Sequence, residues 1–181
     1  DTGETELDLI LGTTTGAVTA ALAGVAATID TALTNGDSAD ALTITLTAGS
    51  VAATVLSSLD TKTNIAVGAG SITTHTGTLA EVKSVVDAGA TITTNAAYAA
   101  TISDAGATAV AATNLSAVGG DTTGTVTVTN AVAISGTEAQ VTAALVTTAT
   151  KVTAASAVVT VSDADTGETE LDLILGTTTG A

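Results

Sequence analysis

Five carboxylates in one short acidic segment are the side chains best placed for chemistry in this chain. They alternate with small and polar residues around a glycine, and Ca²⁺ prefers hard oxygen ligands arranged around a tight bend. The segment lacks the third early Asp or Asn of the standard calcium loop, so the competing interpretation is a solvated acidic turn that precedes a helix. The candidate Ca²⁺ ligands are Asp163, Asp165, Glu168, Glu170 and Asp172.

An Asp-Thr-Gly triad occurs twice, at Asp1–Gly3 and at Asp165–Gly167. Paired aspartates that share a proton are the catalytic unit of aspartic proteases. Here, however, the two triads occupy the same position of one repeated sequence, and Ala164 stands where an apolar strand residue usually precedes the triad. We therefore expect a polar turn at both places and no protease.

The remaining reactive side chains are sparse. His75 is the only histidine and cysteine is absent, so one chain offers no partners for a zinc site or a His-dependent triad. No nucleophile–base pair is present either, and we predict no enzyme, no catalytic residue and no cofactor-binding residue. We expect His75 in a strand or turn, and Tyr98 as a single packed or interfacial ring.

A duplicated segment determines how the chain is organised. The seventeen residues DTGETELDLILGTTTGA fill positions 1–17 and return unchanged at 165–181, which is an offset of 164 residues. Identical ends are what a window cut from a tandem array contains. We expect one full period at 1–164 and the start of the next identical period at 165–181.

The composition predicts a folded chain with small core side chains. Hydrophobic residues make up 45% of it, although Phe, Trp, Met, Cys and Pro are absent and Tyr98 is the only tyrosine. Disordered segments have low hydrophobicity, so disorder is not expected. A core without large aromatics buries little area per unit, and stability must then come from many stacked units.

The net charge of −15 narrows the range of partners. Eighteen acidic residues face three lysines and no arginine, which disfavours nucleic acids and anionic membrane surfaces. The longest apolar runs are too short and too often interrupted to span a bilayer, so we expect no membrane insertion. Absence of cysteine is compatible with an extracellular fibre.

Short Thr-rich turns divide the period into three. Their last residues are 48, 60 and 56 positions apart, which predicts sub-repeats at about 1–49, 50–106 and 107–164. An apolar periodic run precedes each turn and an extended run follows it. The turns end at Gly16, Asn64, Gly124 and Gly180.

Two further segments carry clear helix signals. They read GTLAEVKSVV from position 77 and GTEAQVTAAL from position 136, with Thr78 and Thr137 as N-caps. Glu81 lies three residues after Thr78, as a capping box requires, and Glu138 lies in a first helical turn, where acids are favoured. Helices of two or three turns are not stable alone, so each must pack on a sheet.

The extended runs alternate Val, Ile or Leu with Thr, which is typical of strands with one buried face. Breaks at 68–70, 95–97 and 130–131 predict corners or bulges. The expected fold is an α/β or mainly-β repeat: a solenoid of stacked strand–(short helix) units, about six per 164-residue period. Whether one or two strands accompany each helix stays open.

Three of these segments together resemble the tandem repeats of giant extracellular cell-surface proteins of cyanobacteria and related bacteria. The resemblance is carried by GTLAEV (77–82), GTEAQV (136–141) and LSSLDTKT (56–63), and the pattern extends over the whole chain. It implies secretion and a sheath, motility-associated or matrix role, without catalytic residues.

The functional hypothesis is a structural repeat segment of an extracellular filament, sheath or surface-layer polypeptide. Its expected partner is the protein itself, either as a head-to-tail polymer or as a continuous tandem array. The alternative is a binding module: a calcium-dependent adhesin stalk, or an ice-binding face built from Thr-x-Thr rows. Glycans are a further expected partner, because Asn114-Leu115-Ser116 is a sequon and Ser and Thr hydroxyls are abundant.

Overall fold

The computed structural model describes residues 2–163 and 167–180. Helices and parallel strands alternate along this part of the chain, which places the protein in the α/β class. The α-helices are α1 (Thr2–Thr13), α2 (Ala26–Ala32), α3 (Ala53–Asp60), α4 (Leu79–Ala88), α5 (Ala112–Asp121), α6 (Glu138–Val141) and α7 (Glu168–Leu175). Shorter helical turns are η1 (Gly89–Thr91), the π-turn η2 (Thr142–Val146) and η3 (Thr148–Thr150).

The strands form three sheets in which every pair is parallel. The first contains β1 (Thr19–Gly24), β2 (Ala41–Leu46), β4 (Val67–Ala69) and β6 (Ile92–Thr94), in that order. The second contains β3 (Gly49–Ala52), β5 (Ile72–Gly77), β7 (Ala99–Ile102), β9 (Val126–Val128) and β11 (Val152–Thr153). The third contains β8 (Ala109–Ala111), β10 (Ala133–Gly136) and β12 (Val158–Val161).

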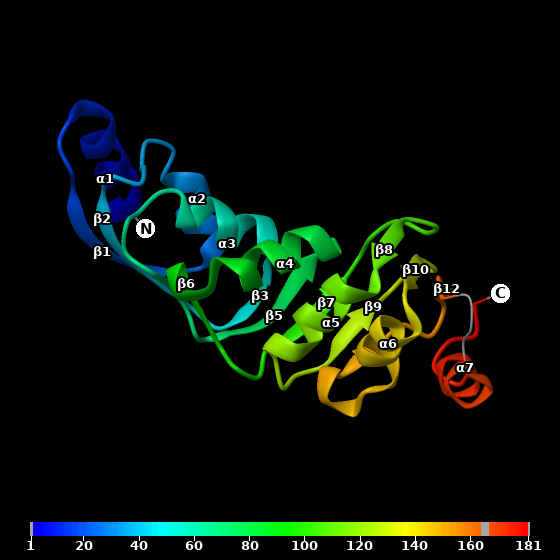
Figure 1. The fold of residues 1–181 in the computed structure, drawn as a ribbon. Helices are drawn as coiled ribbons and strands as arrows, with labels where there is room; N and C mark the ends of the chain where they lie inside the picture. The colour runs from blue at the N-terminus through cyan, green and yellow to red at the C-terminus, as the bar shows by residue number, and fades with distance from the viewer. Residues whose placement is uncertain (1, 164–166, 181) are drawn as a thin grey trace.

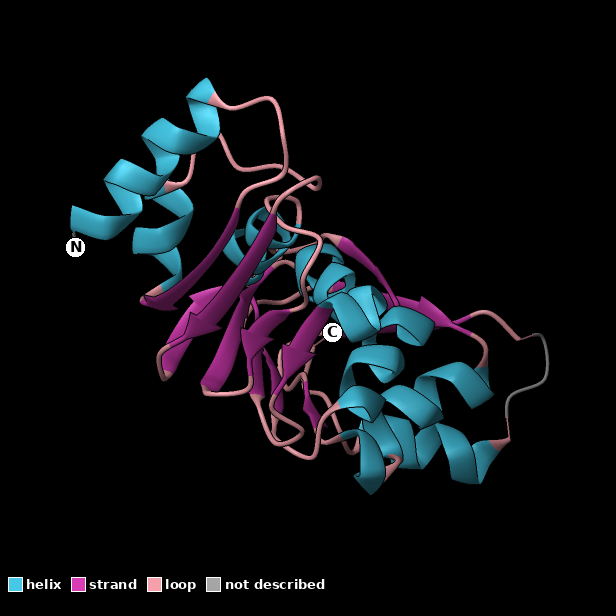
Figure 2. Ribbon diagram, turned by 90° about the vertical axis from the view of Figure 1, so that its left-hand side faces the viewer, coloured by secondary structure: helices cyan, strands magenta, loops and turns pink. Residues whose placement is uncertain are grey.

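Neighbouring strands are close in sequence as well as in space. Paired residues lie between 22 positions apart, as Thr19 and Ala41 do, and 26 apart, as Ala100 and Val126 do. Each α-helix also contacts the next one along the chain. The elements therefore follow one another from α1 at one end of the molecule to α7 at the other (Figure 1), with helices beside the sheets (Figure 2).

The number of strands between helices, which the sequence left open, is two or three from α2 to α7. Where the sequence breaks its extended runs, one strand ends and another begins: Gly70 separates β4 from β5, and residues 95–97 and 130–131 lie between β6 and β7 and between β9 and β10. The corners at 95–97 and 130–131 are confirmed, whereas in the break at 68–70 only Gly70 lies outside a strand, since Gly68 and Ala69 belong to β4. The chain turns there because Gly and Asn tolerate bent backbone that a strand cannot continue through.

Alternation within strands produces a core of small aliphatic side chains. In β2, Leu42, Ile44 and Leu46 are buried while Thr43 and Thr45 are exposed, as a period of two requires. The helices add Ile29, Leu56 and Leu115 and their neighbours from the other side. Tyr98 is the largest of the fully buried side chains.

Both predicted N-caps are confirmed. Thr78 accepts the Glu81 N–H, and the Glu81 carboxylate accepts the Thr78 N–H at 2.7 Å. Thr137 makes the same capping box at α6 with Gln140, a partner that sequence reasoning missed because it considered only Glu138. A Gln three residues after the cap was the available signal.

The Thr-rich turns stack on the chain segment that precedes them in sequence. The hydroxyls of Thr63, Thr122 and Thr178 donate to the main-chain oxygens of Leu42, Tyr98 and Ala157 respectively. Each turn therefore satisfies a carbonyl of its neighbour, which explains why threonine recurs there. The sub-repeat bounds near 49/50 and 106/107 fall at the start of β3 and in the loop before β8, and they stay a prediction.

Candidate functional site

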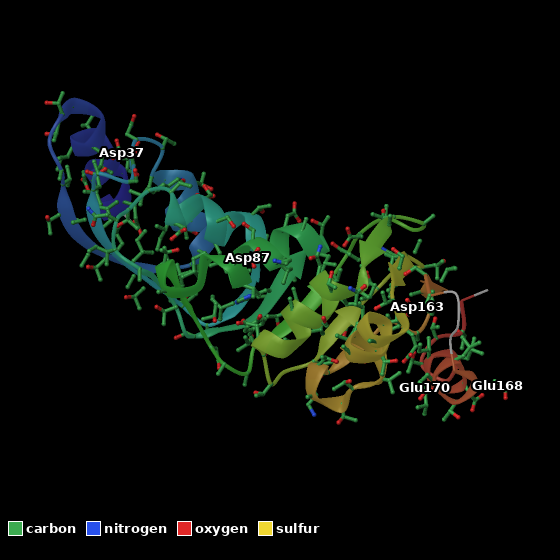
Figure 3. All side chains as sticks on the ribbon, viewed as in Figure 1. Asp37, Asp87, Asp163, Glu168 and Glu170 are labelled. Carbon is green, nitrogen blue, oxygen red and sulfur yellow. The ribbon has the colours of Figure 1, made fainter. Side chains whose placement is uncertain are left out.

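The acidic segment is divided between two elements. The Asp163 carboxylate accepts the Glu138 N–H at 2.6 Å and so lies at the start of α6. Glu168 and Glu170 lie in the first turn of α7 (Figure 3). Asp172 follows in the same helix and is exposed. Asp165, the fifth candidate ligand, lies outside the described residues.

The position of Asp163 has a counterpart elsewhere in the chain. The Asp104 carboxylate accepts the Leu79 N–H at 2.7 Å at the start of α4, also from a segment 25 residues further on. Both aspartates therefore supply a negative charge and an acceptor to a helix N-terminus, where the helix dipole favours them. Within 2–163 and 167–180 no three or more His, Cys, Asp or Glu residues form a group that could hold a metal. Calcium binding stays a prediction.

A buried aromatic pair occupies the middle of the molecule. The rings of His75, in β5, and Tyr98 stack with centroids 4.2 Å apart and planes 12° apart, and both side chains are fully buried. The Tyr98 hydroxyl donates to the Asp121 carboxylate at 2.8 Å. Neither ring nitrogen of His75 has a hydrogen-bond partner among the described residues.

Burial controls the ionisation of this pair. It lowers the pKa of His75 to about 4, although the negative charge of Asp121 acts in the opposite direction. Burial, the hydrogen bond to Asp121 and the charge of that carboxylate all raise the pKa of Tyr98. The pair is thus neutral near pH 7 and forms a packing contact. His75 lies in a strand, one of the two places (strand or turn) that the sequence predicted, but the sequence did not indicate its stacking on Tyr98.

The two ends of the molecule are built from the identical duplicated segments. Residues 4–11 and 168–175 are helical in both copies, as the duplication predicts. The copies differ in the face that they bury. Ile10 is 51% exposed while its equivalent Ile174 is 1% exposed, and Leu11 is 6% exposed while its equivalent Leu175 is 62% exposed.

The reason lies in which neighbour each copy contacts. Helix α1 packs against α2, which follows it in the chain, whereas α7 packs against η2 and α6, which precede it. One sequence therefore has two packing faces, one for the preceding unit and one for the following unit. Each copy has only one of the two faces covered by residues that the structure describes.

The glycine that ends the duplicated segment shows the same difference. A Cβ at Gly180 would overlap the carbonyl of Ala157, on which the turn rests, whereas a Cβ at Gly16 would meet nothing within 4 Å among the described residues. The Thr179 N–H donates to the Ala155 carbonyl at 2.7 Å in the second copy. Gly16 thus belongs to a stacking surface that is uncovered in this structure.

The Asp8 carboxylate binds helix α1 to the following unit through hydrogen bonds. Asp8 accepts the Asn35 N–H at 2.7 Å and the Thr34 hydroxyl at 2.9 Å. Burial has the largest single effect and raises the pKa of Asp8, but the hydrogen bonds from Asn35 and Thr34 together outweigh it and hold the pKa below its ordinary value. The equivalent Asp172 is exposed on α7.

Each end also presents a sheet edge. β1 and β12 are edge strands of their sheets, and a hollow adjoins each of them. The hollow at β1 is lined by residues 20–23 with Gly3, Glu4 and Leu7, and the hollow at β12 by residues 159–161 with α7 and the turn after it. An uncovered parallel edge next to an apolar helix face can add a further strand.

Comparison with protein-family models, with curated proteins and with solved structures gives no match. In the part of the chain that the structure describes, no helix is both long and apolar enough to cross a lipid bilayer.

Proposed function

We propose that this chain is a structural repeat segment of an extracellular filament, sheath or surface-layer polypeptide. In this proposal the strand–helix units form a solenoid of about six units per 164-residue period, which continues into identical periods at both ends. It performs no catalysis and binds itself. The resemblance to the tandem repeats of giant bacterial cell-surface proteins supports the extracellular location.

The observation that carries the proposal is the complementary burial of the duplicated segment. In a continuous array, one copy of this segment lies between two units and covers both faces at once. Ile10 and Leu11 are then both buried, whereas each copy in this chain leaves one of those positions exposed. Two large apolar side chains next to each other on a short amphipathic helix are costly in water unless both faces have partners.

The strand arrangement supports the same proposal. All strands are parallel, each pairs with a strand from a neighbouring unit, and the residue offset stays between 22 and 26. Successive helices contact each other in chain order. Repetition of one unit in one direction is the property that makes repeat proteins extend without closing.

A chain of two periods, residues 1–164 followed by 1–181, tests the array directly. Small-angle X-ray scattering should give one stiff particle whose longest dimension increases by a fixed amount with each added period. Two bodies joined by a flexible connection would contradict the proposal. Electron microscopy of the source material with antibodies against one period should then label a filament or sheath at regular intervals.

An ice-binding module is a second candidate because one row of threonines crosses four strands. Thr76, Thr101, Thr127 and Thr153 are paired in register across β5, β7, β9 and β11. However, the Thr76 hydroxyl donates to the Val51 carbonyl at 3.3 Å, so part of the row bonds to its own sheet. Thermal hysteresis at millimolar protein would favour this function over a purely structural one. The calcium-dependent adhesin stalk depends on the acidic segment and is tested below.

A further inference from the structure

Helix α7 buries fewer of its own side chains than its equivalent α1. In α7 one side chain, Ile174, is buried, while Leu175 and Asp172 are exposed. In α1, Leu11 and Glu4 are buried and Asp8 is bound through its carboxylate to Asn35. Of the two identical segments, α7 therefore has the smaller buried face, and the turn that follows it is held to the loop 154–157 by the Thr178 and Thr179 hydroxyls.

The surface under α7 can accept the duplicated segment from either end of the chain, because the two copies have the same sequence. It consists of η2, the loop 154–157 and β12, and we call it the C-terminal docking surface. Residues 167–180 cover it, and residues 3–16 of a second copy have the same sequence. Ile10, which is exposed on α1, would enter the site that Ile174 fills.

We propose that the C-terminal docking surface exchanges partners: α1 and β1 of a second copy displace α7 and extend the sheet beyond β12. This inference rests on the proposed tandem array, because it uses the same contact between periods. It adds that the contact forms between separate chains, and that α7 blocks it until displaced. The partner is thus a second copy of this chain.

The register of the new strand pair follows from two turns inside the molecule. In the first turn, Thr63 donates to the Leu42 carbonyl. Gly68, five residues after Thr63, then pairs with Thr45, which is three residues after Leu42. The second turn repeats this relationship: Thr122 donates to Tyr98, and five residues later Thr127 pairs with Thr101, three residues after Tyr98.

The same rule applies to the last turn of the chain. Thr178 donates to the Ala157 carbonyl, so the residue five positions later in a continuing array should pair with Thr160. That residue is the equivalent of Thr19 in the next period, at an offset of 164. The incoming β1 therefore lies on β12 with Thr19 opposite Thr160.

The burial pattern agrees with this register. Thr19 and Thr160 are both exposed, and the next pair, Ala20 and Val161, are both half-buried. A shift by one residue would place an inward side chain opposite an outward one, which a sheet with one buried face does not tolerate. Both half-buried rows pack against the core of their own copy and would become a continuous core.

Tethering decides which copy occupies the docking surface. Helix α7 follows β12 after a few residues, and a short connection gives an effective concentration of about millimolar. The chain at micromolar concentration is then expected to be a closed monomer. A separate copy has the advantage of the additional β1–β12 ladder, so exchange should appear when α7 is weakened or when protein is concentrated.

A matched set of full-length variants tests the exchange. Ile174→Asp removes the anchor of α7 and leaves α1 intact, so sedimentation at tens of micromolar should show head-to-tail oligomers. Ile10→Asp alone should stay monomeric, and Ile10→Asp/Ile174→Asp should also be monomeric because neither segment can bind. A peptide of residues 1–17 should return the Ile174→Asp oligomers to monomers. A monomeric, folded Ile174→Asp that does not bind the peptide would overturn the proposal.

Cross-linking supplies a second test that does not depend on the folding of Ile174→Asp. The chain has no cysteine, so Ala20→Cys/Val161→Cys introduces the only thiols. After refolding at millimolar concentration, oxidation should give a ladder of linked chains on a non-reducing gel. The control, Ala20→Cys/Thr160→Cys, places the thiols on opposite faces and should give none. No ladder from the first variant, or equal ladders from both, would contradict the proposed contact.

The two proposals fail separately. A stiff two-period particle together with the absence of exchange would retain the tandem array and reject the exchange between chains. If α1 were the segment displaced instead, Ile174→Asp would lower the amount of oligomer, and the proposed direction of exchange would be wrong.

Discussion

Ile10 and Ile174 occupy the same position of one duplicated sequence, yet the first is half exposed and the second is fully buried. The backbone around them is helical in both copies. The difference follows from the neighbours that each copy contacts, and it gives the molecule two ends that complement each other.

Truncation of the neighbouring leucine should show the reverse asymmetry. Leu11→Ala removes a buried side chain and should lower the free energy of unfolding by about 2–5 kcal/mol, whereas Leu175→Ala should change it by less than about 0.5 kcal/mol. Denaturant unfolding of both variants measures this. In a two-period chain, the leucine at the junction should become as costly to truncate as Leu11. If truncation of the junction leucine in the two-period chain lowers the free energy of unfolding as little as Leu175→Ala does here, the result would count against the array.

The glycines at the ends of the two copies give a second matched pair. Gly180→Ala places a methyl group against the Ala157 carbonyl and should release the last turn and α7, because backbone cannot yield there as a flexible side chain can. Gly16→Ala meets open space in this chain and should be tolerated. Hydrogen exchange of residues 168–175 is the measurement. Protection of α7 that is unchanged by Gly180→Ala would refute the stacking role of the turn.

His75 should make the protein less stable in mild acid. Its pKa is about 4 in the folded state and about 6.5 when exposed, so between these values the unfolded chain binds a proton that the folded chain does not. Stability should fall by about 3 kcal/mol as pH decreases from 6.5 to 4. His75→Phe keeps a ring against Tyr98 and should remove this share of the pH dependence, measured by melting at several pH values. Tyr98→Phe retains His75 and should therefore leave this share of the pH dependence unchanged.

The two aspartates at helix N-termini should stabilise the fold unequally. Asp104→Ala leaves the buried Leu79 N–H without its acceptor and should cost about 1–2 kcal/mol. Asp163→Ala should cost less because Asp163 is exposed and water can replace it. Asp87→Ala, on the exposed surface of α4, is the control for loss of a negative charge, since its solvent-exposed ion pair with Lys83 contributes little. If chemical denaturation shows a larger loss of stability for Asp87→Ala than for Asp104→Ala, net charge rather than capping determines the stability change.

Calcium is expected to raise the melting temperature, because eighteen acidic residues against three lysines leave strong self-repulsion. If the acidic segment binds the ion specifically, millimolar Ca²⁺ should raise the melting temperature more than Mg²⁺ at equal concentration. Glu168→Gln/Glu170→Gln should remove this difference between the two ions. Equal melting in calcium and in chelator would exclude a site there, and with it the calcium-dependent stalk.

Local features of this protein were predictable from the sequence because their causes are local. The capping box of Thr78 and Glu81 involves residues one helical turn apart, and the alternation in β2 has a period of two. The duplication of residues 1–17 at 165–181 likewise needs no structure to be recognised. These signals combined predicted an α/β or mainly-β class, and the structure is α/β.

The tertiary structure decided the relationships between units, which depend on contacts across 20 to 30 residues. The stacking of His75 on Tyr98 and the use of Asp163 at the start of α6 both arise because successive units bring such residues side by side. The duplicated helix is the clearest case. Its sequence fixes an apolar helix with two packing faces, but burial is a property of the surrounding atoms, so only the neighbours determine whether Ile10 or Leu11 points into the core.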